Sequence, residues 1–187
     1  MFIATSEYYA RRIRQKDNMN FKKIICWPPL LAGIGAGVTI SFLAYITYQS
    51  ILSDSNYGLW LAASFGSSVV VVFGYPKNEF AQPKNVILGH LLCTMVGIIF
   101  LTLFDISQDR SIFFLSLGLA VGISVMLMMA FNITHPPAGG NTIVVMIAQD
   151  SFQFLIFPIL VGAITIVIAG IIYNRFILKK NYPLKWI

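Results

Sequence analysis

A run of nine residues inside a long apolar stretch holds the groups best suited to chemistry. It reads Thr134, His135, Pro136, Pro137, Ala138, Gly139, Gly140, Asn141 and Thr142. The two prolines remove backbone donors and the glycines loosen the chain, so a helix cannot pass through unbroken. We expect a short helix to begin near Asn141 and to direct its positive end, with the open amides of Gly139 and Gly140, at a small anion. His135 would supply a further donor. The alternative is a packed kink in which His135 is hydrogen-bonded to a carbonyl group.

A second segment has similar chemistry. Gly66, Ser67 and Ser68 open a short apolar run, and we expect both hydroxyls to act as donors where a helix begins. If this helix start and the one near Asn141 converge at the middle of the bilayer, an anion would bind between them. The alternative is close helix packing through small residues, which is common in membranes.

A third segment lies at the expected start of a long helix. Pro83 suits the first turn, and Lys84 and Asn85 follow it at the membrane surface. Gly89 and His90 come later, with His90 about 9 Å deeper at about 1.5 Å per residue. We interpret Lys84, Asn85 and His90 as a gate or vestibule for an anion. The alternative is a lysine that extends to the membrane surface beside a hydrogen-bonded histidine.

Other kinds of chemistry lack the residues that they need. No carboxylate lies inside an apolar run, so we expect no proton relay or sodium site built on Asp or Glu. Two histidines with no acidic residue at ligand spacing predict no metal site, and we expect no cofactor. A catalytic serine would need a base and an orienting group beside it. We therefore do not expect an enzyme.

The composition indicates an integral membrane protein. Of the 187 residues, 57% are hydrophobic and only 11% are charged, and the mean hydropathy is +0.77. Soluble domains carry roughly 25% charged residues, and 13 basic with 7 acidic side chains are too few to cover a soluble fold of this length. The net charge of +6 comes from basic residues that flank apolar segments, which favours membrane orientation over nucleic-acid binding.

The charged residues divide the chain into six apolar elements. Four are long enough to span a bilayer, which takes about 20 residues, and they lie within 24–53, 85–104, 111–134 and 151–174. Two are short, Tyr57–Tyr75 and Ala138–Gln149, and the second would cover only about 18 Å as a helix. We expect an all-α integral membrane fold of four long transmembrane helices plus two short broken or re-entrant helices.

The basic residues predict the orientation. Six of them precede the first span and four follow the last, so we expect a multi-pass protein of the inner membrane with both termini in the cytoplasm. If all six elements cross, Lys77 and Lys84 are also cytoplasmic and only Arg110 lies outside. If the short elements re-enter instead, the charge bias is slightly weaker, so this rule favours six crossings only by a small margin.

The two halves of the chain show an internal repeat. A shift of 73 residues aligns Gly66 with Gly139, Gly89 with Gly162 and Gly97 with Gly170, and a shift of 83 aligns the first helix of each half. We predict two three-element repeats; three crossings in each would give them opposite topologies, as in many transporters, and two would make them parallel. The expected organisation is a basic cytoplasmic segment at 1–23, repeat 1 at 24–104, repeat 2 at 105–177 and a basic cytoplasmic tail at 178–187.

Three ordered blocks resemble the HPP family of integral membrane proteins, over roughly residues 25–175. They are Gly66-Ser67-Ser68 with Phe73-Gly74, Gln82-Pro83-Lys84-Asn85 with Gly89-His90, and His135-Pro136-Pro137-Ala138-Gly139 with Asn141. Ser67 and Gly140 depart from the family pattern, where alanine is expected, but both changes are small. Some relatives add a regulatory domain after the membrane part, and we do not expect one here.

The resemblance implies four transmembrane helices and nitrite transport, which is associated with members from chloroplast envelopes and cyanobacteria. The residues that it marks are Gly66, Ser68, Gln82, Pro83, Asn85, Gly89, His90, His135, Pro136, Pro137, Gly139 and Asn141. We expect a transporter or channel for a small monovalent anion, nitrite above all, bound at half-helix N-termini near the bilayer midplane. The expected binding residues are Gly66, Ser67, Ser68, His135, Gly139, Gly140, Asn141 and Thr142.

A non-transporting membrane scaffold or partner subunit is the alternative. We also expect a homo-oligomer, because six short elements leave little room for a sealed path in one copy.

Overall fold

The computed structural model describes residues 27–51, 61–104, 112–149 and 151–186, and these residues form helices and short connections without a strand. The first half contains α2 (Trp27–Ile51), α3 (Leu61–Val69) continued by the π-helix η2 (Val70–Gly74), η3 (Glu79–Ala81) and α4 (Pro83–Phe104). The second half contains α5 (Phe113–Ala130), η5 (Pro136–Ala138) and α6 (Gly139–Ala148). It ends with α7 (Phe152–Phe154), η6 (Leu155–Leu160), α8 (Val161–Ile171) and η7 (Ile172–Ile177).

Within the described ranges, four helices are long and apolar enough to cross a membrane. They are Pro28–Gln49, Pro83–Phe104, Phe113–Ala130 and the bent span Phe152–Ile177. The bend in the last span falls at Phe157, which has non-helical backbone angles before Pro158, because proline removes a helical hydrogen bond and clashes with the preceding turn. Between these spans lie the short helices α3 with η2, and α6. The expected all-α fold with four long and two short helices is confirmed.

One expected helix boundary is wrong. The sequence led us to place a helix start at Gly66, Ser67 and Ser68, but α3 begins at Leu61. The three residues therefore lie in its second turn, where backbone amides bond within the helix rather than facing a ligand. The expected helix start after the two prolines is confirmed, since α6 begins at Gly139 and the α-helical structure is interrupted by a non-helical segment at 131–135.

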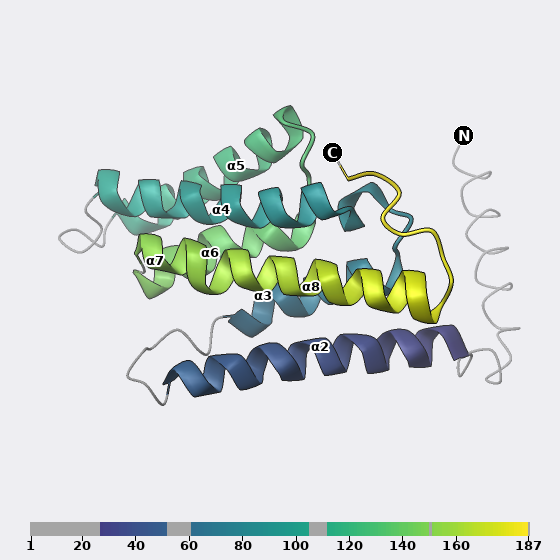
Figure 1. The fold of residues 1–187 in the computed structure, drawn as a ribbon. Coiled ribbons are helices and arrows are strands. Elements are labelled where there is room, and N and C mark those ends of the chain that lie inside the picture. The colour runs from purple at the N-terminus through teal and green to yellow at the C-terminus, as the bar shows by residue number, and fades with distance from the viewer. Residues whose placement is uncertain (1–26, 52–60, 105–111, 150, 187) are drawn as a thin grey trace, which may run out of the picture.

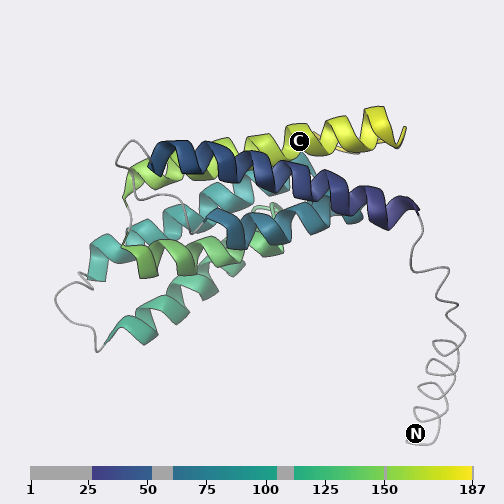
Figure 2. The ribbon, with the colours of Figure 1, turned by 90° about the horizontal axis from the view of Figure 1, so that it is seen from below.

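The helices form an elongated bundle with α2 and α5 at opposite edges (Figures 1 and 2). Helix α4 contacts α5, α6 and α8, whereas α2 contacts α3, η2 and α8. The two short helices therefore lie within the bundle, each against a long helix from the other half of the chain. This arrangement brings the segments around residues 68 and 139 to the same region.

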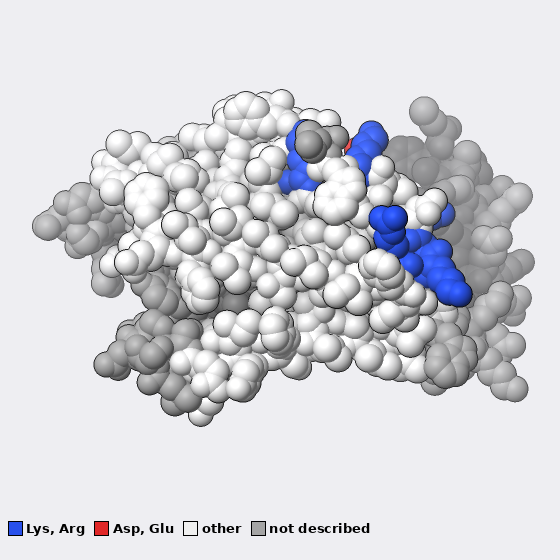
Figure 3. Space-filling model, in the orientation of Figure 1, with Lys and Arg blue, Asp and Glu red and all other residues white. Residues whose placement is uncertain are grey.

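The basic residues that the structure describes gather at one end of the bundle (Figure 3). They occupy the connection after η2, the start of α4, the end of η7 and the C-terminal tail, and they are Lys77, Lys84, Arg175, Lys179, Lys180 and Lys185. We call this the basic end. Helix α2 begins there and η7 ends there (Figure 1). Glu79 is the one carboxylate residue within the described ranges, and it lies in the connection at the same end.

Glycines allow the two halves to interlock. A Cβ atom added to Gly97 of α4 would collide with Val145 of α6, and one added to Gly170 of α8 would collide with Val72 of η2. The two glycines are 73 residues apart, and so are the two valines. A second pair of contacts has the same spacing, Gly162 with Phe65 and Gly89 with Ala138. Interlocked repeats would produce such reciprocal contacts, but the repeat itself stays a prediction.

The C-terminal tail folds back onto the connection between η2 and α4. The buried Tyr182 side chain donates its hydroxyl proton to the carbonyl oxygen of Ala81 at 2.8 Å. Gln82 Oε1 accepts from the backbone N–H of Leu184 at 2.8 Å, and Gln82 Nε2 donates to the carbonyl oxygens of Pro76 and Asn78. Gln82, one of the residues marked by the family resemblance, thus ties the tail to this connection.

We expect Tyr182→Phe to lower the free energy of unfolding by about 1–2 kcal/mol, because it leaves a buried carbonyl oxygen without its donor. Burial raises the pKa of Tyr182, so the native state favours the neutral phenol. The stability that depends on the neutral Tyr182 phenol is fully present below about pH 10, the pKa of tyrosine in an unfolded chain. It is lost as the pH rises through the higher pKa of the folded state. Thermal unfolding in detergent micelles at neutral and alkaline pH measures both effects. The exposed Tyr75→Phe is the control; equal melting temperatures for the two variants would contradict the prediction.

Candidate functional site

Four buried polar side chains from separate elements meet inside the bundle. Ser68 comes from α3, His90 from α4, His135 from the residue before η5 and Asn141 from α6. Ser68 and both histidines are fully buried, and Asn141 is 1% exposed. We call these four residues the histidine cluster. Polar groups inside a membrane bundle are costly, so such a cluster is a candidate site.

The Ser68 hydroxyl lies between the two imidazole rings. Its Oγ is 2.8 Å from Nε2 of His90 and 2.9 Å from Nε2 of His135. The outer ring nitrogens also have partners, since His135 Nδ1 lies 2.7 Å from the carbonyl oxygen of Phe80 and His90 Nδ1 lies 2.8 Å from Asn141 Nδ2. The cluster is therefore one continuous chain of hydrogen bonds that joins all three candidate segments of the sequence.

The partners at each end determine where the protons lie. A carbonyl oxygen only accepts, so His135 donates from Nδ1 to Phe80, and in its neutral form its Nε2 accepts from Ser68. At the other end, Thr94 donates to the carbonyl oxygen of His90 at 2.8 Å, which leaves its Oγ1 to accept from Asn141 Nδ2 at 3.2 Å. The Asn141 amide is thereby oriented to donate to Nδ1 of His90, so the neutral His90 carries its proton on Nε2 and donates to Ser68. All four bonds run one way, from Asn141 to Phe80.

The cluster can also accommodate one extra proton. The carbonyl oxygen of Ser64 lies 3.0 Å from Ser68 Oγ and offers the hydroxyl a second acceptor. If His135 is protonated on both nitrogens, it donates to Phe80 and to Ser68. Ser68 then turns its own proton to Ser64 and still accepts from both rings. Every donor in the cluster keeps a partner in both states.

The start of α6 does not offer the open amide that we expected at Gly139. Pro136 and Pro137 have no N–H group, Ala138 donates to the carbonyl oxygen of His135 at 2.9 Å, and Gly139 donates to that of Pro136. The expectation of an open amide at Gly139 is therefore wrong, because the proline pair and the 3-10 turn use up the donors of the first turn. The polar groups that face the interior here belong to side chains.

The other expected binding residues lie around the cluster in different environments. Thr142 Oγ1 is 2.9 Å from both the Cys93 carbonyl oxygen and Ser124 Oγ, so it joins α6 to α4 and α5. Gly140 approaches Ser64, since an added Cβ would lie 3.9 Å from the Cβ atom of that serine. Ser67 is exposed and points away from the cluster, and Gly66 is half-buried with open space beside it.

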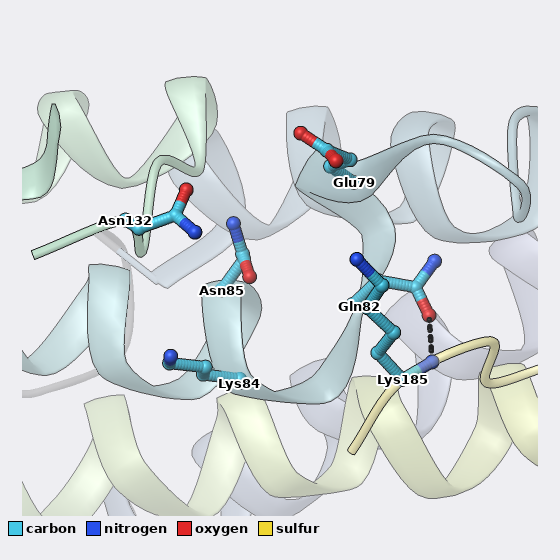
Figure 4. A pocket seen from close by; sticks show the side chains of 6 residues that line it. All are labelled: Glu79, Gln82, Lys84, Asn85, Asn132 and Lys185. Atoms are coloured by element: carbon cyan, nitrogen blue, oxygen red, sulfur yellow. Dashed lines mark hydrogen bonds between the residues drawn. The ribbon is translucent and has the colours of Figure 1, made fainter. Parts of the chain in front are cut away.

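A pocket of about 130 Å³ opens at the basic end, where sequence reasoning placed a vestibule (Figure 4). Lys84 and Asn85 line it as expected, whereas His90 belongs to the buried cluster. The remaining lining residues are Glu79, Gln82, Asn132 and Lys185. Nothing in the sequence indicated Asn132 or Lys185, because Lys185 reaches the pocket only through the folded-back tail. Two lysines and one glutamate give the lining a net positive charge.

Short covalent and hydrogen-bonded links join the pocket to the cluster. Phe80, whose carbonyl oxygen accepts from His135, lies between the pocket residues Glu79 and Gln82 in the chain. Asn85 Nδ2 donates to the carbonyl oxygen of Thr134 at 3.0 Å, next to His135. The pocket lining and His135 are therefore joined through the Phe80 carbonyl group and the Asn85 side chain. Among the described residues, no three His, Cys, Asp or Glu side chains gather as a metal site.

Comparison with known proteins identifies similar membrane chains. The family model described as "HPP, transmembrane region" matches residues 22–183. A transmembrane protein of Dictyostelium discoideum is 35% identical over 151 residues, which cover 79% of this chain and 52% of that protein. Another transmembrane protein of the same organism is 29% identical over 167 residues, which cover 87% of this chain and 51% of that protein. The chain spans about half the length of these curated relatives. No solved structure matches it significantly.

Proposed function

Because the chain belongs to the HPP family of integral membrane proteins, we propose that it transports a small monovalent anion, with nitrite as the first candidate substrate. The observation that carries this proposal is a positively charged pocket whose lining is linked, through the Phe80 carbonyl group and the Asn85 side chain, to a buried histidine cluster within the membrane bundle. We propose transport rather than catalysis, with no cofactor.

The basic end would attract the anion. All six lysine and arginine residues of the described ranges lie there, and clustered charge of one sign raises the local concentration of counter-ions. Lys84 and Lys185 would bind the anion in the pocket, and the amides of Asn85 and Asn132 would replace part of its hydration shell. Lys84 and Asn85 keep the vestibule role that the sequence suggested.

The histidine cluster would hold the proton that accompanies the anion. Nitrite and a proton together carry no net charge, so their joint passage avoids the cost of a bare charge in the membrane interior. The two hydrogen-bonded states of Ser68 let the cluster hold an added proton on Nε2 of His135 and release it again. In this proposal, the side chains of Ser68, His135 and Asn141 replace the backbone amides as the polar groups along the path. Because the cluster is fully packed, passage of the anion requires α3 and α6 to separate.

Location and assembly follow the same reasoning. We propose an inner-membrane protein with the basic end in the cytoplasm, as the positive-inside rule favours. In this orientation the start of α2 and the end of η7 both face the cytoplasm (Figure 1). We also propose a homo-oligomer, because four spans and two short helices leave little room for a sealed path in one copy.

A non-transporting membrane scaffold is the second candidate. One observation favours it: Ser68, both histidines and Asn141 all have partners within the chain and none is more than 1% exposed. In this interpretation the cluster ties the short helices to α4, and the pocket has no transport role. The two candidates differ in whether the purified protein moves an anion.

Anion uptake into liposomes tests the proposal. We expect the purified protein to carry nitrite, with faster uptake when a pH gradient drives protons in the same direction. Nitrate, formate and chloride provide the comparison. Flux of another anion alone would keep the mechanism and replace the substrate, whereas no flux from folded protein would favour the scaffold.

We expect Lys84→Gln and Lys185→Gln each to lower nitrite uptake about tenfold at low nitrite concentration, which corresponds to about 1.4 kcal/mol of binding free energy. Each substitution removes one positive charge from the pocket lining without removing a packed side chain, because both residues are at least partly exposed. Lys77→Gln is the matched control, since Lys77 is exposed at the same end but does not line the pocket. Equal uptake by all three variants would exclude the pocket from the path.

A further inference from the structure

A second groove, of about 390 Å³, lies at the outer side of the bundle between α2 and the elements η2 and η7. One wall is the first part of α2, from Pro28 to Ala36, and the other includes Phe73 and Tyr173. Eight residues of helix correspond to about 12 Å. The groove therefore extends from the basic end into the depth of the membrane where lipid headgroups give way to acyl chains.

The lining of the groove is apolar along its length and basic at one end. Prolines, small residues, valines and aromatic rings form the body, and Lys180 is the charged residue that lines it. No carboxylate takes part in the lining. Arg175 and Lys179 lie close to Lys180 in the chain and are also exposed. An apolar body with a cationic end complements a molecule with an acyl chain and an anionic headgroup.

A buried hydroxyl in the groove wall has no hydrogen-bond partner. Tyr173 is only 5% exposed, and its hydroxyl oxygen is buried without a donor or acceptor in the structure. Its ring packs against Phe73 with centroids 5.0 Å apart. Buried polar groups are nearly always paired, so a shift of the Tyr173 side chain toward a ligand oxygen in the groove would supply the partner that this hydroxyl lacks.

The glycines leave the groove open. A Cβ atom added to Gly33 of α2 or to Gly74 of η2 would meet no atom within 4 Å. By contrast, Gly35 on another face of α2 is in contact, since its added Cβ would lie 2.8 Å from the ring of Phe73. Helix α2 thus approaches η2 closely at one position and leaves space beside it.

We propose that this groove binds an anionic phospholipid from the leaflet at the basic end. Lys180 contacts the phosphate, the Tyr173 hydroxyl bonds with an ester or phosphate oxygen, and one acyl chain lies along α2 beside Gly33. The bilayer supplies this ligand at high local concentration. The proposal is independent of the transported substrate.

Native mass spectrometry of the full chain in detergent tests this site. Phosphatidylglycerol and phosphatidylcholine with the same acyl chains are titrated separately. We expect the wild-type protein to retain phosphatidylglycerol with about tenfold higher affinity, because only this headgroup carries a net charge for Lys180. Glycerol phosphate without acyl chains should not compete at the same concentrations. Equal retention of both lipids, or full competition by glycerol phosphate, would overturn the proposal.

Matched variants locate the bound lipid. We expect Gly33→Leu to fill the groove and lower phosphatidylglycerol affinity about tenfold, while Gly122→Leu on the exposed face of α5 leaves it unchanged. Both positions have open space for a side chain, so both variants should fold.

Lys180→Gln should remove the headgroup preference and Lys179→Gln should keep it. Tyr173→Phe should weaken retention several-fold. Wild-type affinity in both Gly33→Leu and Tyr173→Phe, or a loss of oligomers instead of lipid in Gly33→Leu, would show that the groove is not a lipid site.

Discussion

Replacing Gly97 with valine is expected to lower the free energy of unfolding by about 3 kcal/mol, the upper range for overpacking a core. A Cβ atom on this residue would collide with the side chain of Val145 and would lie 3.1 Å from the carbonyl oxygen and 3.3 Å from the Cα atom of Thr142. The second obstacle is backbone, so rotation of a side chain cannot relieve it. Helices α4 and α6 must separate, and Asn141 moves away from His90.

Thermal unfolding and the yield of monodisperse protein after detergent extraction measure this effect. Gly118→Val in α5 is the control, because it makes the same change in helix propensity at a position with no atom within 4 Å. The double variant Gly97→Ala with Val145→Ala should recover part of the stability that Gly97→Ala loses alone, since it removes one of the two obstacles. Equal stability of Gly97→Val and Gly118→Val would contradict the close approach of α4 and α6.

The sequence predicted the helical elements well because membrane spans depend on length and hydropathy alone. The break at the two prolines before α6 is equally local and was also found. The start of α3 was misplaced, because glycine and serine inside a membrane helix pack as readily as they end it. A five-residue error in this boundary turned Ser67 and Ser68 into expected helix-start donors, whereas the structure buries one and exposes the other.

The site was predicted in its parts but not in its geometry. Ser68, His135 and Asn141 were expected around one site; in the structure Ser68 bonds directly to His135 and is linked to Asn141 through His90. His90 was assigned to the vestibule, because spacing along α4 gives its depth but not the direction in which it points. Helix α4 is apolar on all sides, so no polar face indicated its rotation. Contacts such as that of Gln82 with the tail join residues 102 positions apart and leave no local pattern.

The proline pair illustrates why a motif can be recognised and still be misread. Glycines after prolines suggested open amides at the positive end of a helix. The structure differs, because prolines have no N–H group and the next two backbone amides donate to the carbonyl oxygens of His135 and Pro136. The motif therefore fixes the position of the His135 imidazole rather than offering backbone donors. Ser68 is the hydrogen-bond partner shared by His135 and His90, so we expect its loss to have the largest effect on the histidine cluster.

Ser68→Ala is expected to lower the free energy of unfolding by about 2–4 kcal/mol and to abolish most proton-coupled uptake. The hydroxyl accepts from Nε2 of His90 and donates to Nε2 of His135, so its removal leaves a buried donor and a buried acceptor without partners. Each unpaired group costs about 1–3 kcal/mol. The space left by one oxygen atom is too small for a water molecule with good geometry. Ser67→Ala, at the exposed neighbouring position, should change neither quantity.

The tautomers of the two histidines separate a functional role from a purely structural one. In the wild-type protein we expect nitrogen-15 NMR to find the proton of His90 on Nε2 and that of His135 on Nδ1, because the chain of bonds from Asn141 to Phe80 has one direction. In Ser68→Ala the two rings lose their common partner, so the proton on Nε2 of a doubly protonated His135 has no acceptor even in protein that remains folded. If both rings carried their protons on the same nitrogen, the one-way chain would be wrong. If Ser68→Ala kept wild-type uptake at equal amounts of folded protein, the cluster would hold the short helices in place without passing a proton.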